Sequence, residues 1–206
     1  MSASRERLKA MTAPISPEEK LSQAKHMAKE RFPYFAFGLD EIMPWRVPDH
    51  MLASIPTIAV SHDGKMAWNP RFVMDTPLEE LMWVWVHELY HLMMKHHGRW
   101  LKAVGLGHLS IKDGHKAAAE DPKILATARP WNIAADAGVN QKLEELARHA
   151  GTKLPDGYVS PATLMLPYGE VVETYFDHVR RDDDPDDDPE EGQGSEGQGS
   201  EGQGSE

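Results

Sequence analysis

A strongly apolar segment between Met82 and Met94 contains two histidines and a glutamate, and this combination constrains the fold more than any other feature of the sequence. The segment reads MWVWVHELYHLMM, and the only other ionisable side chain in it belongs to Tyr90. A carboxylate and two imidazoles are costly to bury among apolar side chains unless something pairs with them. The rest of the chain must therefore provide a partner for these three side chains.

The three polar residues form the pattern HExxH, at His87, Glu88 and His91. The residues TPLE at 76–79 predict a capping box with proline at the first helical position, and Gly98 predicts the helix end. On such a helix His87 and His91 point the same way and can share one ion. Glu88 lies beside that ion as a general base rather than a ligand. The alternative is a pair of core histidines bonded to backbone carbonyls, with Glu88 facing solvent.

A third ligand can be sought within the same segment. His97 lies six residues after His91, the spacing of the extended motif HExxHxxGxxH, in which a glycine breaks the helix. Here Met94 occupies the glycine position. In an unbroken helix both His97 and His96 point away from the shared face. This route therefore requires a helix break that the sequence does not predict.

A second route leads to the segment WNIAADAGVNQ, where Asn132, Asp136 and Asn140 recur every four residues and form a polar stripe on a predicted helix. The alanines and the glycine around Asp136 would let this helix approach another closely. We expect Asp136 to be the third ligand, although an exposed acid on a helix surface is the alternative. His97, Asn132 and Asn140 are expected to support the ligands or to replace one of them.

Four residues are candidates to stabilise an oxyanion: His97, Arg99, Tyr158 and Tyr168. The sequence does not choose among them. For His96, His97 and Arg99 the simpler interpretation is that they are solubilising residues at a helix C-terminus, where positive charge is favourable. The alternative is that they support the metal ligands or an oxyanion.

Composition narrows the chemistry. The chain has no cysteine, so any metal site must use His, Asp and Glu. Residues 182–206 hold 11 of the 33 acidic residues and no Lys or Arg, so the remainder has 22 acidic against 22 basic residues. This balance predicts no nucleic-acid or anionic-membrane partner. No secretory signal and no apolar run of about 20 residues is found, so a cytoplasmic protein is expected.

Three regions are expected: a flexible arm at 1–15, one folded domain at 16–181 and a disordered tail at 182–206, which ends in three GQGSE repeats. Within the domain, Ser16 and Glu19 predict the start of a helix. The segment MPWRVPD is expected to be an irregular connection, and 57–61 with 65–68 a pair of strands around the turn HDG. Residues 102–128 are expected to be mainly loop, 130–148 a helix, and 168–181 a final helix.

Several blocks together resemble a bacterial and phage metallopeptidase domain family that often precedes a von Willebrand factor A-like domain. The blocks are DGKMAWNPRFVMDTPLEELMWVWVHELYHLMMKHHGR, WNIAADAGVNQKL and LPYGEVVETYFDHV. The resemblance implies an α+β, zincin-like fold with helices packed on a small sheet, zinc ligands at His87, His91 and Asp136, and a general base at Glu88. The family often continues into its second domain through an acidic, glycine-rich linker, and this sequence stops at that linker.

We therefore expect a zinc-dependent hydrolase, most simply a metallopeptidase that acts on peptides or proteins, with a zinc-bound water activated by Glu88. The strand 65–68 is expected to offer its edge to an extended peptide, with Trp68 and Asn69 as substrate contacts. The alternatives are a non-catalytic zinc-binding module that works with an ATPase or a von Willebrand factor A-like partner, and a structural role without metal.

Overall fold

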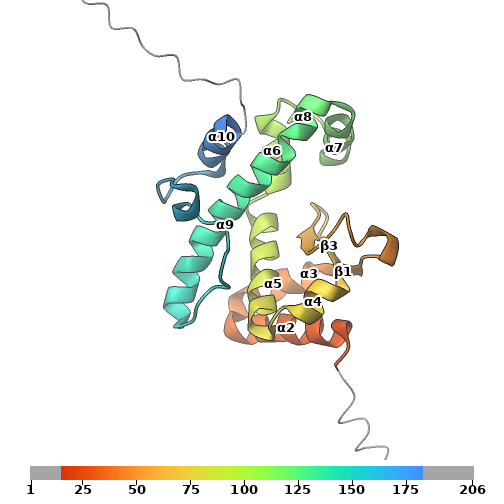
Figure 1. The fold of residues 1–206 in the computed structure, drawn as a ribbon, viewed down its shortest axis with the longest axis vertical. Helices are drawn as coiled ribbons and strands as arrows, with labels where there is room; N and C mark the ends of the chain where they lie inside the picture. Colours follow the sequence, from red (N-terminus) through yellow and green to blue (C-terminus); the bar gives the residue numbers. More distant parts are fainter. Residues whose placement is uncertain (1–14, 183–206) are drawn as a thin grey trace, which may run out of the picture.

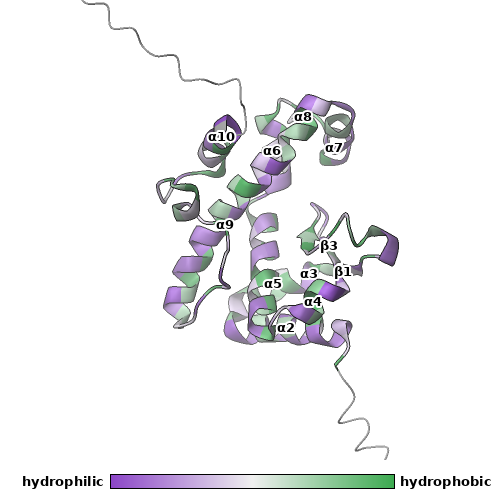
Figure 2. Ribbon diagram, viewed as in Figure 1, coloured by the Kyte–Doolittle hydropathy of each residue, from purple (hydrophilic) through white to green (hydrophobic). Residues whose placement is uncertain are grey.

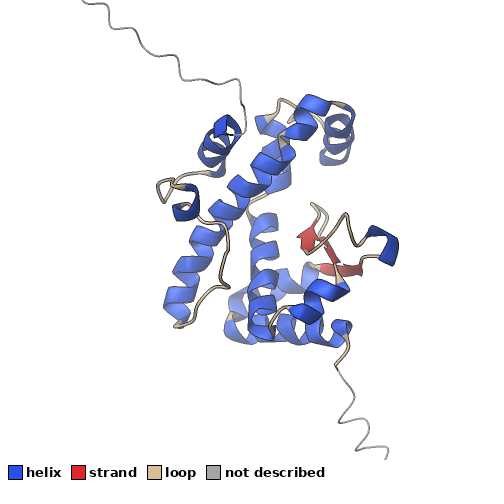
Figure 3. Ribbon diagram, in the orientation of Figure 1, coloured by secondary structure: helices blue, strands red, loops and turns tan. Residues whose placement is uncertain are grey.

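The described part of the protein is mostly helical and contains one small three-stranded sheet (Figures 1 and 3). A computed structural model describes residues 15–182, so the predicted arm 1–15 and tail 182–206 lie, except at their boundary residues, outside the described part. The elements follow in the order α2 (Pro17–Arg31), η1 (Pro33–Phe35), α3 (Ala36–Glu41), β1 (Met43–Arg46), η2 (Asp49–Met51), β2 (Ile58–Val60), β3 (Lys65–Trp68), α4 (Pro70–Asp75), α5 (Leu78–Met93), α6 (His96–Ala103), α7 (Ile111–Glu120), α8 (Pro122–Ala126), α9 (Ala128–Ala150), η3 (Ala162–Leu164) and α10 (Val172–Asp182).

Helix α2 begins as its sequence predicts. The Ser16 side chain accepts a hydrogen bond from the Glu19 backbone, and the Glu19 carboxylate accepts one from the Ser16 backbone. This reciprocal pair satisfies two amide donors that the first turn would otherwise leave free. Leu21, Ala24 and Ala28 are buried, and the helix packs against α5. Figure 2 shows hydrophobic residues on α5 near this contact.

The sheet contains one strand more than predicted. Strands β2 and β3 pair antiparallel, as expected, but β1 pairs parallel with β3 on its other side, so the order is β1-β3-β2. The expectation that MPWRVPD is an irregular connection is therefore wrong. So is the expectation that strand 65–68 offers a free edge, because β3 is the central strand. The edge that faces α5 belongs to β2.

The helix that carries HExxH is shorter than predicted. It ends at Met93 rather than Gly98, and Lys95 adopts a left-handed conformation with φ 56° before α6 begins at His96. Its start also differs, because Thr76 does not cap α5. The Thr76 hydroxyl instead donates to the Phe72 carbonyl at the end of α4.

The segment 102–128, expected to be mainly loop, contains α7 and α8. A capping signal was present: the Ser110 side chain accepts a hydrogen bond from the backbone of Asp113, the S-x-x-D pattern of a helix start. Asp121 caps α8 in the same way, just before Pro122. Both starts could have been found from the sequence.

Helix α9, predicted at 130–148, is the longest element and joins two cores. Its C-terminal half packs with α2, α5 and the sheet through Val139, Leu143 and Ala147. Its N-terminal half packs with α6, α7 and α10 through residues that include Trp131 and the alanines at 134, 135 and 137. Asp136 and Asn140 lie where the two halves meet, beside α5. Among the described residues, no helix combines the length and the apolarity that crossing a bilayer requires.

Candidate metal centre

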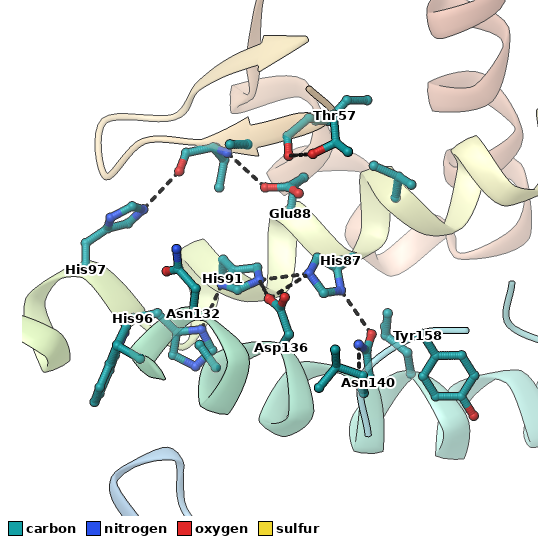
Figure 4. A pocket seen from close by; sticks show the side chains of 18 of the residues that line it. Thr57, His87, Glu88, His91, His96, His97, Asn132, Asp136, Asn140 and Tyr158 are labelled. Atoms are coloured by element: carbon teal, nitrogen blue, oxygen red, sulfur yellow. Dashed lines mark hydrogen bonds and ion pairs between the residues drawn. The ribbon is translucent and has the colours of Figure 1, made fainter. Parts of the chain in front are cut away.

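Three side chains from two helices converge at one point, as Figure 4 shows. His87 and His91 of α5 have their Nε2 atoms 2.8 Å apart, and Asp136 Oδ1 of α9 lies 3.4 Å from the first and 3.1 Å from the second. Ligands about 2.0–2.1 Å from a tetrahedral zinc ion stand roughly 3.3 Å apart. Both distances to Asp136 match this spacing and the distance between the two nitrogens is shorter by about 0.5 Å, so a small outward shift of one ring would let the three atoms share an ion. This group, called the candidate metal centre below, could hold a metal ion.

Hydrogen bonds fix the tautomer of His87. Asn140 Nδ2 donates to the Val159 carbonyl at 2.7 Å, which turns its Oδ1 toward His87 Nδ1 at 3.0 Å. Because a carbonyl oxygen only accepts, Nδ1 of His87 carries the proton and Nε2 carries a lone pair. That lone pair faces the Nε2 of His91. Two nitrogen lone pairs at 2.8 Å repel each other, so a proton or a metal cation belongs between them.

His91 is held through its other nitrogen by a residue that sequence reasoning had directed elsewhere. His96 Nδ1 lies 3.0 Å from His91 Nδ1, and the His96 ring is almost fully buried, with 3% exposed. The left-handed conformation of Lys95 allows this contact, because it turns His96, the first residue of α6, back toward α5. When His91 Nε2 faces a metal ion, its Nδ1–H donates to His96. The remaining proton of His96 then sits on Nε2, which is buried without a partner among the described residues.

The charges of the centre are coupled. Burial raises the pKa of Asp136, but its hydrogen bonds with His87 and His91 outweigh this effect and hold the pKa below its ordinary value. Burial lowers the pKa of His87, yet the interactions with Asp136 and Glu88 leave that pKa raised. The site therefore favours an ionised carboxylate and stabilises positive charge beside it, whether a proton or a metal cation carries that charge.

Glu88 lies outside the converging group, on the side of the sheet (Figure 4). Its Oε2 accepts a hydrogen bond from the Val60 backbone of β2 at 2.9 Å. The residue is 7% exposed, and burial raises the pKa of its carboxyl above the ordinary value. Its Oε1 has no hydrogen-bond partner among the described residues. The sequence offered no signal that a main-chain group of β2 would orient this carboxylate.

Of the residues predicted to support or replace a ligand, His97 and Asn132 both line the cleft over the site, but neither belongs to the group of three converging side chains. The Nε2 of His97 donates to the Val60 carbonyl at 3.0 Å. Asn132 is exposed and lines the cleft one turn before Asp136. Asn140 supports His87, as described above.

Most of the candidate oxyanion donors are engaged elsewhere. The guanidinium of Arg99 pairs with both carboxylate oxygens of Glu173 in α10. The hydroxyls of Tyr158 and Tyr168 both donate to Glu144, at 2.9 and 3.2 Å. In Figure 4 the hydroxyl of Tyr158 points away from the candidate metal centre. Of the four candidates, only His97 and Tyr158 line the cleft.

The predicted substrate contacts Trp68 and Asn69 are buried and do not line the cleft. Asn69 caps α4 by accepting from the Arg71 backbone, and its amide donates to the carbonyls of Leu52 and Ile55. Trp68 belongs to the main core. Both residues support the fold, so the prediction that they contact a substrate is not supported.

A cleft of about 950 Å³ opens over the candidate metal centre. On the side of His87 it is lined by apolar residues of several elements. On the side of His91 it is lined by histidines and tryptophans of α6, α7 and α9. The apolar members are Phe72, Trp83, Val84, Leu143, Leu154 and Pro155, and the second group comprises His96, His97, Trp100, His115 and Trp131. A volume of this size is large enough for several residues of a peptide.

A comparison of the sequence with known protein families supports a metal site in this chain. A family model with the description "Putative metallopeptidase domain" matches residues 16–206. No curated protein and no solved structure matches the chain. The family match covers nearly the whole chain, including both helices that supply the converging side chains. The chain therefore belongs to the metallopeptidase-domain family that this description names.

Proposed function

We propose that this protein is a zinc-dependent hydrolase with a zincin-like arrangement, and that its substrates are peptides or proteins. The observation that carries the proposal is the orientation of His87, whose tautomer is set by Asn140 so that a lone pair faces His91 and Asp136. A metal-binding histidine commonly has its second nitrogen bonded in this way.

The donor set supports zinc. Two imidazole nitrogens and one carboxylate oxygen are typical of catalytic zinc sites, which leave a fourth position for water or substrate. His87, His91 and Asp136 would hold the ion. When bound, zinc would supply a Lewis acid that lowers the pKa of water and polarises a carbonyl.

Glu88 is the proposed general base. Val60 N–H fixes one oxygen of its carboxylate, and within residues 15–182 the other oxygen has no hydrogen-bond partner, so it is available to take a proton. Burial raises the pKa of this carboxyl, which brings its proton affinity closer to that needed at neutral pH. Glu88 would accept a proton from the attacking water and pass it to the leaving amine.

Strand β2 is the proposed substrate edge in place of β3. Ala59 pairs with Ala67 of β3, so the backbone groups of Ile58 and Val60 point to the free side. Both groups of Val60 are occupied, by Glu88 and His97. The backbone of Ile58 is therefore the position where an extended peptide could add a strand.

The test measures zinc content and proteolysis for the full chain. Glu88→Gln should keep zinc and lose about 10²–10⁴-fold of the hydrolysis rate on unfolded casein or a peptide panel. Asp136→Ala should lose zinc. The matched control Glu120→Gln removes an exposed carboxylate of α7 and should change neither.

Two results would contradict the proposal. Wild-type protein without zinc, after purification in zinc-containing buffer, would remove its basis. Zinc retained with no hydrolysis of any substrate would favour a non-catalytic zinc-binding module that acts with an ATPase or a von Willebrand factor A-like partner.

A further inference from the structure

A second group of histidines lies beside the cleft and takes no part in the candidate metal centre. His62 is in the turn between β2 and β3, His97 is in the first turn of α6, and His115 is in α7. Their ring centroids lie 5.7 Å apart for His97 and His115, 6.1 Å for His62 and His115, and 6.3 Å for His62 and His97. These residues, called the histidine trio below, come from three separate elements, so only the tertiary fold brings them together.

The hydrogen bond of His97 sets which nitrogen of its ring carries a lone pair. Its Nε2 lies 3.0 Å from the Val60 carbonyl, which can only accept, so Nε2 carries the proton. Nδ1 is then an unprotonated donor for a metal ion. A histidine whose second nitrogen donates to a backbone carbonyl is the common arrangement in metal sites.

His115 offers a second free nitrogen. Its Nε2 is buried and has no hydrogen-bond partner among the described residues, while Trp100 packs on the ring at 5.3 Å between centroids. A buried polar atom without a partner costs about 1–3 kcal/mol, so a ligand that satisfies it is favoured. Burial lowers the pKa of His115 and lowers that of His97 to about 4. Both rings are thus neutral at pH 7, the form that binds metal ions.

We propose that His62, His97 and His115 form a second binding site for a divalent transition-metal ion such as Zn²⁺. Imidazoles alone favour ions of this class over Mg²⁺ or Ca²⁺, which prefer oxygen ligands. In a tetrahedral zinc site the ring centroids lie roughly 5 Å apart, so the trio must close by about 1 Å. Unlike the candidate metal centre, its nitrogens do not all lie within 4.8 Å of one another. Rotation of the exposed His62 ring, which lies in a turn, would bring it closer to the other two rings, and His97 and His115, at 5.7 Å, would need a smaller shift toward each other.

An ion at this site would join the β2–β3 turn to α6 and α7. His97 and His115 line the cleft, so the ion would lie at its rim, on the side of His91. His97 also contacts Val60, the residue that orients Glu88 through its N–H group. Binding of the second ion would therefore hold β2 in the position that fixes Glu88.

The experiment counts zinc ions per chain by equilibrium dialysis of the full-length protein. The main variant is His62→Ala, because His62 is exposed and its removal should not disturb the core. His50→Ala is the matched control, since His50 is also exposed but lies in η2, away from the trio. Asp136→Ala removes a ligand of the candidate metal centre alone. Weak binding to acidic residues is common to all variants and cancels in the differences.

Wild type and His50→Ala should bind one ion more than His62→Ala. Asp136→Ala should also lose one ion, and the double variant with His62→Ala should lose two. Equal zinc content in wild type and His62→Ala would overturn the proposal, whatever happens at the first site. If Asp136→Ala binds as much zinc as wild type, the candidate metal centre is wrong and the trio is judged by His62→Ala alone.

Discussion

Replacing His96 with leucine should separate metal affinity from fold stability. His96 is buried, its Nδ1 contacts Nδ1 of His91, and its Nε2 has no partner among the described residues. Leucine has a similar volume and no polar atom. In the metal-free protein the substitution removes an unsatisfied polar group, whose cost is about 1–3 kcal/mol, while it leaves one nitrogen of His91 without a partner. The free energy of unfolding should therefore change little or rise by about 1 kcal/mol.

Metal affinity should move in the opposite direction. With a metal ion on Nε2 of His91, the Nδ1–H needs an acceptor, and leucine offers none. Loss of such a supporting contact typically weakens metal binding about 10–100-fold, which corresponds to roughly 1.4–2.7 kcal/mol. His96→Asn keeps a carbonyl oxygen that can accept, so its affinity should lie between those of the leucine variant and wild type.

Two measurements decide the outcome: zinc affinity by competition with a chelator, and urea unfolding in the presence of excess chelator. A leucine variant that binds zinc as tightly as wild type would show that His96 does not orient His91. A variant that loses zinc affinity and also several kcal/mol of metal-free stability would show that His96 acts through packing. In either case the asparagine variant identifies whether an acceptor is needed.

Three further predictions rest on single local features of the structure. Asn140→Leu should weaken zinc binding about 10–100-fold, measured by chelator competition, because His87 loses the acceptor for its Nδ1–H. A double-mutant cycle on Arg99 and Glu173 should give a coupling of about 0.2–1 kcal/mol, since both side chains are partly exposed. Arg99 lowers the pKa of Glu173, so the coupling should be present at neutral pH. Urea unfolding measured at decreasing pH should show that the coupling is lost as the pH falls through this lowered pKa. Lys95→Gly should leave stability unchanged or raise it by up to about 1 kcal/mol, because Lys95 has φ 56°; destabilisation as large as that of Lys116→Gly within α7 would contradict this.

The parts of the fold that follow from local signals could be predicted from the sequence. The Ser16 capping box, the turn between β2 and β3, and the polar stripe of α9 each depend on residues that are near neighbours in the chain. The pairing of β1 with β3 joins segments about 20 residues apart, and the prolines of MPWRVPD argue against a strand. An edge position makes a proline tolerable, but the sequence alone does not show which strand is at the edge.

The residues of the candidate site also fall into two groups, those that local sequence patterns predict and those that depend on tertiary packing. The spacing of HExxH places His87 and His91 on one face of a helix whatever the rest of the chain does, and the Asn-Asp-Asn stripe indicated the second helix. The contacts of Val60 and His96 depend instead on where the sheet and α6 lie in space. No periodic pattern marks either residue, so Val60 was missed and a supporting role for His96 was considered only as the less favoured interpretation.

The break after α5 explains why the histidines at 96 and 97 have different roles. In a continuous helix neither ring would reach the metal-binding face. The left-handed Lys95 redirects the chain, so that His96 turns back to His91 while His97 reaches the backbone of β2. A glycine at this position would have indicated such a turn, and a lysine does not. The conformation of Lys95 thus places His96 against a ligand of the candidate metal centre, and it places His97 against β2, the strand whose Val60 N–H holds Glu88.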